Sequence, residues 1–191
     1  MTNPIRTGTC KHCGVEYVKR AAMQKACTLD CALAMAREKR QKAQERENRK
    51  VRAKVREKLK TRSEWLREAQ AAFNGYIRAR DYGKPCISCG SSFGDVVFGG
   101  KADAGHYRST GAAPHLRFNL LNCAAQCVRC NRHLSGNVVE YRHGLVRRIG
   151  QDRVVELEND NETRKFDIEY LKRLKKIFNK RARYYRRRRG L

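Results

Sequence analysis

The segments Cys86-Ile-Ser-Cys89 and Cys127-Val-Arg-Cys130 decide how the middle of this 191-residue chain folds. Each is a tight turn that presents two thiolates. Two such turns brought together give a structural zinc ion the four soft ligands of a tetrahedral site. The 37 residues that separate the turns are more than a simple zinc ribbon needs. We therefore expect one zinc ion held by these four cysteines, with further secondary structure built between the turns.

A second group of four cysteines near the N-terminus has shorter spacing and is typical of a small zinc finger. Its members are Cys10, Cys13, Cys27 and Cys31. The ninth cysteine, Cys123, falls outside both groups, and we expect a small buried side chain there. His12 lies inside the first turn of the finger and is expected to be exposed rather than ligating. The sequence thus predicts two structural Zn²⁺ sites.

The charge balance points to a polyanionic partner. The chain carries 44 lysines and arginines against 19 acidic residues, a formal net charge of +25. So basic a chain repels itself until a polyanion neutralises it, and nucleic acid is the commonest one. No run approaches the ~18 apolar residues of a membrane span, and no signal sequence is recognisable. We therefore expect a cytoplasmic, DNA-binding protein without membrane contact, whose cysteines bind metal rather than form disulfides.

Composition predicts a helix-rich α+β fold in five segments. Residues 32–60 lack Gly and Pro and are rich in helix formers, which favours a long exposed basic helix of about 43 Å. The alternative for this stretch is a partly disordered, solvated linker. The expected segments are an N-terminal four-cysteine zinc finger (1–34), a basic helical linker (35–60), a zinc-stabilised core (61–150), C-terminal helices (151–180) and an arginine-rich tail (181–191).

Two helices flank the expected core. A capping box formed by Thr61 and Glu64 starts one over residues 62–80, and Asp167 is placed to cap another. The first has a buried face at helical spacing, made of Trp65, Leu66, Ala69, Phe73, Tyr76 and Ile77. In the tail, six of the nine residues from 181 to 189 are arginine, Arg186 and Arg187 among them. We expect that tail to be disordered alone and to bind phosphates.

The insertion between the zinc turns reads as strand, loop, strand and helix. Residues 96–98 and 102–107 are expected to be short strands joined by Gly99-Gly100. A loop over 108–117 follows, then a strand over 120–122 and a short helix over 128–135. The zinc turns would hold both ends of this arrangement.

Within this insertion, Asp103-Ala-Gly-His106, then Asn122, then Asn131 directly after the last zinc cysteine resemble the signature of the HNH, or ββα-metal, nucleases. The same set is similar to that of phage Holliday-junction resolving endonucleases. More narrowly, residues 61–150 resemble the NinG (Rap) recombination family of lambdoid bacteriophages. The motifs that carry this resemblance are RARDYGKPCISCG, DAGHYRSTGAAPHLRFN and QCVRCNRHLSGN.

The chemistry of phosphodiester hydrolysis explains these residue types. A neutral imidazole accepts a proton from water near neutral pH, which suits His106 as general base. Asp103 and Asn131 offer hard oxygen ligands to a catalytic Mg²⁺ or Mn²⁺, with water and phosphate completing the shell. The resemblance implies that Asn122 holds the loop or orients His106. His115 and His133 are weaker candidates.

Four arginines around this centre are expected to hold phosphates, although Arg117 or Arg129 could instead serve folding. They are Arg108, Arg117, Arg129 and Arg132. The resemblance implies branched DNA substrates, such as Holliday junctions and D-loops, and a phage protein that works in the bacterial host cytoplasm. By analogy we also expect a homodimer, with recombination proteins as further partners.

Three other functions fit parts of the sequence. The chain could be a zinc-finger protein that binds branched DNA without cutting it, and it would then need no catalytic metal. It could be an RNA-binding zinc protein, for which the charge alone would suffice. It could also be a sequence-specific HNH endonuclease, which would cut linear duplex at a defined site.

Overall fold

The computed structural model describes residues 6–93 and 102–190, which form two compact units, Met1–Lys60 and Thr61–Leu191. The predicted strand over 96–98 and the turn at Gly99-Gly100 lie outside the described residues. None of the helices in the two described ranges has the length and apolar character that crossing a bilayer requires.

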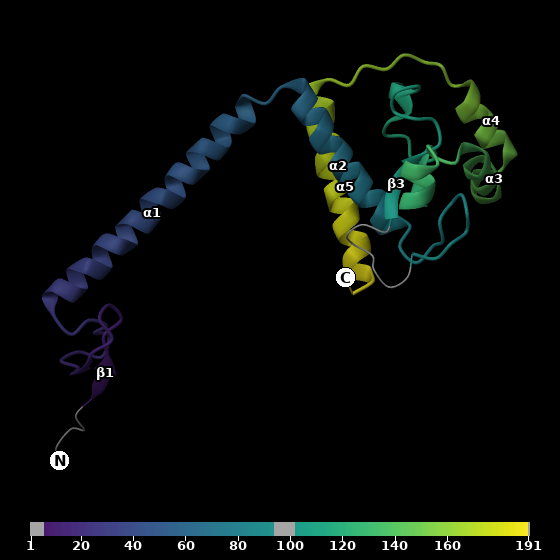
Figure 1. Cartoon of the computed structure of the whole chain (residues 1–191). Coiled ribbons are helices and arrows are strands. Elements are labelled where there is room, and N and C mark those ends of the chain that lie inside the picture. The colour runs from purple at the N-terminus through teal and green to yellow at the C-terminus, as the bar shows by residue number, and fades with distance from the viewer. Residues whose placement is uncertain (1–5, 94–101, 191) are drawn as a thin grey trace. The chain divides into compact units, whose positions relative to one another are not determined.

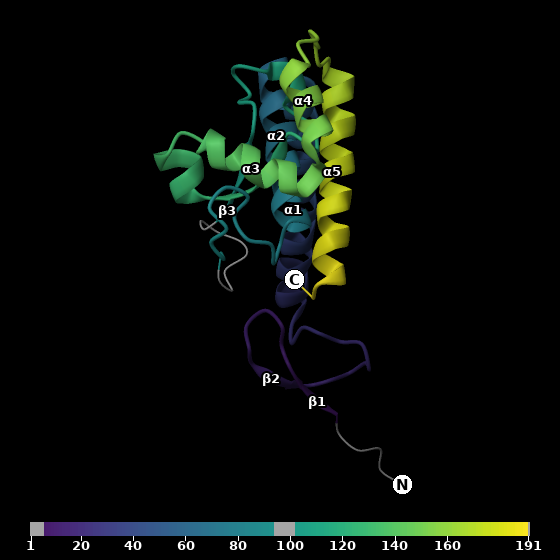
Figure 2. The ribbon, with the colours of Figure 1, turned by 90° about the vertical axis from the view of Figure 1, so that its right-hand side faces the viewer.

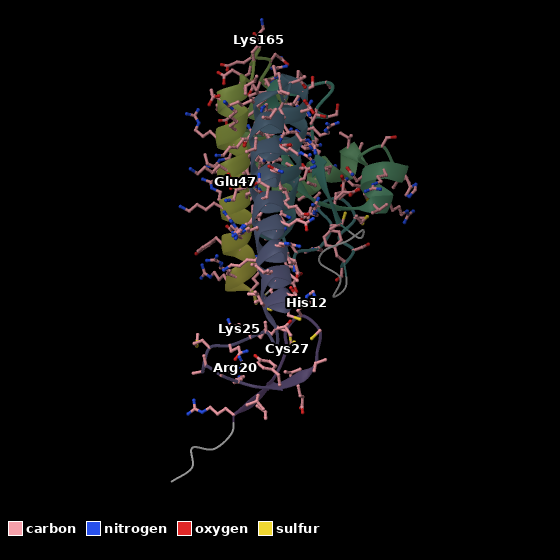
Figure 3. The ribbon with its side chains drawn as sticks, turned by 90° about the vertical axis from the view of Figure 1, so that its left-hand side faces the viewer. His12, Arg20, Lys25, Cys27, Glu47 and Lys165 are labelled. Atoms are coloured by element: carbon pink, nitrogen blue, oxygen red, sulfur yellow. The ribbon has the colours of Figure 1, made fainter. Side chains whose placement is uncertain are left out.

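The N-terminal unit consists of a two-stranded finger followed by one long helix. Strands β1 (Thr7–Thr9) and β2 (Glu16–Val18) pair antiparallel, and α1 (Leu29–Lys58) follows, capped by Thr28. Helix α1 buries none of its side chains, which radiate from the ribbon in Figure 3. The long exposed helix is therefore confirmed, and it begins three residues before the predicted position.

The larger unit has three layers. Helices α2 (Arg62–Arg80) and α5 (Ile168–Arg188) run side by side, as Figures 1 and 2 both show. Strands β3 (Ala102–His106) and β4 (Cys123–Cys127) form an antiparallel hairpin in the middle. A 3₁₀ turn η1 (Pro114–Leu116) lies between the strands, and a short π-helix η2 (Arg129–His133) follows them. Helices α3 (Val138–Ile149) and α4 (Gln151–Asn159) form the third layer.

The α2–α5 pair holds one of two hydrophobic clusters. The predicted bounds of α2, its Thr61–Glu64 capping box and its buried aromatic face are all confirmed. Phe73 is fully buried and packs edge-on against Phe118 and Phe178. The second cluster lies between the hairpin and the α3–α4 layer. Its buried members are Tyr107, Ala113, Leu116, Ala124, Tyr141, Leu145, Val154 and Leu157.

The second strand of the hairpin lies three residues beyond the predicted position. Residues 120–122 are irregular, and β4 starts at Cys123. The side-chain oxygen of Asn119 accepts the Leu121 N–H at 2.9 Å, and the Asn122 side chain bonds to Arg108 and Leu116. These side-chain hydrogen bonds turn the backbone where the apolar run Leu120-Leu121 predicted a strand.

The arginine-rich end of the chain is helical, so the expectation of a disordered tail is wrong. Helix α5 continues to Arg188, because Phe178 and Ala182 keep its apolar face buried on that last stretch. Beyond the helix, Arg189 donates to the carbonyl oxygens of Ala79 and Arg80. The end of α5 is thus attached to the end of α2.

A buried ion network joins the layers. The Asp81 side chain has no solvent exposure, and its carboxylate accepts from Arg80, Arg148 and the Ala125 N–H. Arg80 also donates to the carbonyl oxygens of Leu120 and Cys123. Burial raises the pKa of Asp81, but the hydrogen bonds from the two guanidinium groups outweigh it and hold that pKa below its usual range.

We expect Asp81→Asn to lower the free energy of unfolding by about 3 kcal/mol, since it leaves two buried guanidinium groups without a carboxylate. A depressed pKa stabilises the fold above the unfolded-state value of about 4, and this contribution is lost as pH falls below it. Denaturant unfolding from pH 7 to 3 should therefore show a difference between wild type and variant that shrinks in acid. The exposed Asp152→Asn is the matched control, and an equal effect there would contradict the assignment.

Gly144 of α3 packs against the backbone of the first zinc turn. A Cβ at this position would lie 1.9 Å from the Ile87 carbonyl oxygen, and backbone cannot move aside cheaply. We expect Gly144→Ala to destabilise the fold by about 1–3 kcal/mol through overpacking. Gly75→Ala makes the same change inside α2 with no atom within 4 Å, and should stabilise by about 0.5–1 kcal/mol. Thermal unfolding of both variants would reveal the opposite signs.

Candidate metal centre and catalytic site

The cysteines of the larger unit form a cluster that fits zinc. The sulfur atoms of Cys86, Cys89, Cys127 and Cys130 all lie within 4.8 Å of one another. Tetrahedral zinc with bonds of ~2.3 Å places its sulfurs about 3.8 Å apart, and Cys89 Sγ lies 3.8 Å from Cys127 Sγ. The four residues predicted from spacing are therefore together in space and can hold one ion.

Hydrogen bonds hold these sulfurs in place. The backbone N–H of Cys127 donates to Cys86 Sγ at 3.3 Å, and that of Cys130 donates to Cys127 Sγ at 3.4 Å. The Asn137 amide reaches Cys130 Sγ at 3.5 Å. The Ser91 hydroxyl, 3.2 Å from Cys89 Sγ, lowers the pKa of Cys89 to about 6. Such partners orient the ligands. Burial outweighs them at Cys86, Cys127 and Cys130, whose pKa values it raises, so metal binding there would displace the thiol protons.

The N-terminal finger contains the second cluster. Cys10, Cys13, Cys27 and Cys31 also have all four sulfurs within 4.8 Å of one another, and the Cys13 and Cys27 sulfurs are 3.5 Å apart. The backbone N–H of Cys13 lowers the pKa of Cys10 to about 6. His12 is exposed, as predicted; Figure 3 shows His12 and Cys27 in this region.

The core cluster determines where Asn131 lies. Cys127 is the last residue of β4 and Cys130 lies in η2, so ligand geometry sets the path between strand and helix. Asn131 follows directly, and its Nδ2 donates to Asp103 Oδ2 at 2.9 Å. The structure therefore brings together the two residues predicted to bind a catalytic cation. The amide oxygen of Asn131 and the carboxylate of Asp103 are hard donors suited to Mg²⁺ or Mn²⁺.

A guanidinium group also contacts the Asp103 carboxylate. Arg132 donates Nε to Asp103 Oδ2 at 2.7 Å and Nη2 to Oδ1 at 2.9 Å. These bonds lower the pKa of Asp103, which keeps it ionised. The Arg132 side chain is 63% exposed, so moving it aside for a metal ion would cost little.

His106 lies at the end of the same strand but on the other side of the hairpin. Side chains alternate along a strand, and Ala104 packs toward the α2–α5 cluster. The His106 ring likewise lies 5.9 Å from that of Phe73, between centroids. Asp103 alternates away toward η2. The predicted base therefore lies on one face of the hairpin, and the predicted metal ligand Asp103 lies on the other.

The environment of His106 specifies its tautomer and protonation. Nε2 lies 3.0 Å from the Arg117 carbonyl oxygen, which can only accept, so Nε2 carries the proton. Nδ1 then keeps its lone pair and lies 3.9 Å from Cys123 Sγ. Burial lowers the pKa of His106 below its usual value. The imidazole is therefore neutral at pH 7 and able to accept a proton.

Asn122 holds the loop between the strands. The side chain is fully buried; its oxygen accepts the Arg108 N–H at 2.9 Å, and its amide donates to the carbonyls of Arg108 and Leu116. This loop carries Arg117, whose carbonyl orients His106. Asn122 thus supports His106 through the backbone, by the loop-holding role that the family resemblance implied.

Two of the arginines that were predicted to bind phosphate form hydrogen bonds within the fold. The Arg108 guanidinium donates to the Leu157 and Asp160 carbonyls and to the Asn161 side chain, which attaches the loop after α4. Arg117 reaches the Gln70 side chain and the Thr110 carbonyl. Arg108 therefore has a structural role, its contact with phosphate stays a prediction, and Arg117 has the folding role left open for it.

The remaining arginines stay candidates for phosphate. Arg129 is exposed on η2 beside Arg132, and Arg187 is exposed near the end of α5, where Arg186 is half-buried. Among the histidines, His115 bonds to the Asp160 carbonyl at 2.8 Å, while His133 and His143 are exposed.

Sequence reasoning missed Arg78 and the position of Cys123. The charge of Arg78, on α2, adds to that of Arg132 in lowering the pKa of Asp103. Cys123 is buried as predicted, but its register partner is His106, which places its sulfur beside the imidazole. Arg78 stands in the quoted motif RARDYGKPCISCG, but only the packing of α2 on β3 brings it near Asp103.

Comparison with known proteins gives a consistent family. A family model described as "Bacteriophage Lambda NinG protein" matches residues 2–188. The chain is 39% identical over 191 residues to "Protein ninG" of Escherichia phage lambda, covering 92% of this chain and 91% of that relative. It is 41% identical to "Protein ninG" of Escherichia phage 933W, over 95% of this chain and 98% of the relative. No solved structure was found to be similar to it.

We expect the purified protein to contain two zinc ions per chain by elemental mass spectrometry, one for each cluster. Cys127→Ser should reduce this to one and lower the thermal stability of the larger unit, because metal binding contributes directly to folding. Cys123→Ala removes a thiol outside both clusters and should retain two ions. A zinc content that falls equally in both variants would contradict the ligand assignment.

Proposed function

Because the chain belongs to the NinG family of bacteriophage proteins, we propose that it is a zinc-stabilised endonuclease that cuts branched DNA during phage recombination. The hairpin β3–β4 and the helix η2 would form its ββα-metal core. Its substrates would be Holliday junctions, D-loops and related intermediates in the host cytoplasm. A homodimer would allow paired cuts, and other recombination proteins would act beside it.

The observation that carries this proposal is the contact between Asp103 and Asn131, in which the Asn131 amide donates to the Asp103 carboxylate. The two side chains come from β3 and η2. Strand β3 pairs with β4, and a cysteine cluster that fits zinc joins the end of β4 to η2. Asp103 and Asn131 would hold Mg²⁺ or Mn²⁺, with water filling the other positions. When bound, such a cation stabilises charge on a phosphate.

His106 supplies the second part of the chemistry. Its Nε2 proton is donated to the Arg117 carbonyl, so Nδ1 is the nitrogen that would accept a proton from the attacking water. The lowered pKa of His106 keeps that nitrogen unprotonated near neutral pH. A positioned base of this kind accelerates hydrolysis by about 10²–10⁴-fold.

The charge supports DNA as the partner. At +25 the chain would attract phosphates over its whole surface. Such binding weakens as the salt concentration rises, because the counterions that it releases from DNA then gain less free energy. No base-reading helix is evident in the sequence, so recognition would follow the shape of the DNA rather than its bases. That favours junctions over a defined duplex site.

A binding module without nuclease activity is the second candidate. Two observations favour it: Arg132 already pairs with Asp103 in bidentate geometry, and His106 lies across the pleat from Asp103. In such a protein the guanidinium would occupy the position of the cation permanently. The sequence-specific endonuclease and the RNA-binding protein have no comparable support.

The test is cleavage of labelled four-way junction, D-loop and linear duplex with Mg²⁺, Mn²⁺ or EDTA. We expect metal-dependent nicking near the branch, which His106→Ala lowers by at least about 100-fold while junction binding persists. Asp103→Asn should also lose cleavage, because it removes the charged metal ligand. Since Arg132 must leave Asp103, Arg132→Ala should reduce the metal concentration needed.

His143→Ala is the matched control, because His143 is an exposed histidine of α3 away from the hairpin. It should cut like wild type. Tight junction binding with no cleavage in any metal would instead establish the binding module. Cleavage that survives His106→Ala would remove His106 from the role of base.

A further inference from the structure

A long groove runs between α2 and α5. It has a volume of about 760 Å³, and both helices contribute to its walls. The helices run in the same direction, since Lys175 pairs with Glu68 near their starts and Arg189 bonds to Ala79 at their ends. The lining residues are Glu68, Ala71, Ala72, Gly75, Arg78, Lys175, Lys176, Asn179, Ala182, Arg183 and Arg186.

The lining is strongly cationic. It contains five basic side chains and a single carboxylate, Glu68. That carboxylate is already 2.8 Å from the ammonium of Lys175. The groove therefore has an excess of positive charge that its own residues do not balance, and its complement is a polyanion.

Gly75 indicates that the groove is kept open. A glycine inside a helix costs about 0.5–1 kcal/mol relative to alanine. A tight contact usually explains such a residue, but a Cβ at Gly75 would meet no atom within 4 Å. Ala71, Ala72 and Ala182 continue this floor of small side chains. The packing of the protein does not require the glycine, whereas a ligand that approaches the α2 backbone closely would.

The groove leads toward the Asp103 site. Arg78 lines the end of it that lies near the C-terminus of α2. Helix α2 also packs directly on β3, the strand that carries Asp103. On α5, the basic residues from Lys175 to Arg186 span eleven positions, about 16 Å at 1.5 Å per residue. That length equals the axial rise of about five base pairs of duplex DNA at ~3.4 Å each, so that several phosphates of one strand fall along it.

We propose that the α2–α5 groove binds the phosphodiester backbone of one DNA strand and directs it toward Asp103. The inference rests on the proposed function in taking DNA as the partner, but it concerns binding rather than cleavage. Lys176, Arg183 and Arg186 contact successive phosphates along α5. The small residues around Gly75 let the backbone lie close to α2.

The steric test replaces Gly75 by leucine, which fills the groove without changing charge. Binding is measured by fluorescence anisotropy in EDTA with labelled four-way junction, linear duplex, single-stranded DNA and an RNA hairpin. We expect Gly75→Leu to unfold at the same temperature as wild type or higher, yet to bind junction at least about tenfold more weakly. A protein in which Gly75 served packing alone would lose stability and retain affinity.

The electrostatic test compares two reversals of equal charge. Arg183→Glu lies in the groove, and Arg67→Glu lies on α2 outside its lining; both side chains are exposed. Arg183→Glu should weaken junction binding severalfold more than Arg67→Glu. It should also reduce the slope of log affinity against log salt by about 1 or more. This pair decides the proposal even if Gly75→Leu fails to fold.

The proposal is overturned if Gly75→Leu folds and binds junction like wild type, or if the two reversals weaken binding equally. Preference for an RNA hairpin over every DNA probe would assign the groove to another nucleic acid and overturn it as well. Weaker binding by both groove variants in a protein that cuts no DNA would support the groove and refute the endonuclease. If His106→Ala abolishes cleavage while both groove variants bind and cut like wild type, the endonuclease is supported and the groove proposal is refuted.

Discussion

The buried carboxylate of Asp81 is the interaction on which the larger unit depends. An ionised group without solvent exposure is tolerated only if its hydrogen bonds are satisfied. Arg80, Arg148 and the Ala125 N–H together satisfy it, and they come from the end of α2, from α3 and from β4. Three elements are therefore held at one side chain, and the hairpin must lie between the two helical layers.

The cysteine cluster adds a second constraint at the end of the same hairpin. A helical segment of five residues such as η2 has little stability of its own. Its position follows from Cys127 and Cys130, whose sulfurs must meet those of the first turn in a tetrahedron. Asn131 comes directly after that ligand and so reaches Asp103. The contact between Asn131 and Asp103 therefore depends on where the cysteine cluster holds η2.

The arginines of this chain divide into two kinds that composition cannot separate. Arg108 satisfies backbone carbonyls and joins distant parts of the fold, as Arg80 does. Arg183 and Arg187 are exposed on α5, whose inner face is apolar and packed on α2. A net charge of +25 therefore overstates the charge available to a ligand, although the α2–α5 groove shows that a large excess remains on one side of the helix pair.

The sequence by itself determined the features set within a few residues: the paired cysteine turns, the bounds of α2 with its Thr61–Glu64 cap, and the helix start at Asp167. Its motifs also identified the protein family. Tertiary structure decided the rest, because the partner of a strand or a guanidinium is chosen among residues far apart in the chain. Pairing of His106 with Cys123 put the imidazole beside that thiol, and the alternation of side chains along β3 then turned Asp103 to the other face of the hairpin. Packing of α5 on α2 ordered a tail whose composition alone predicts disorder.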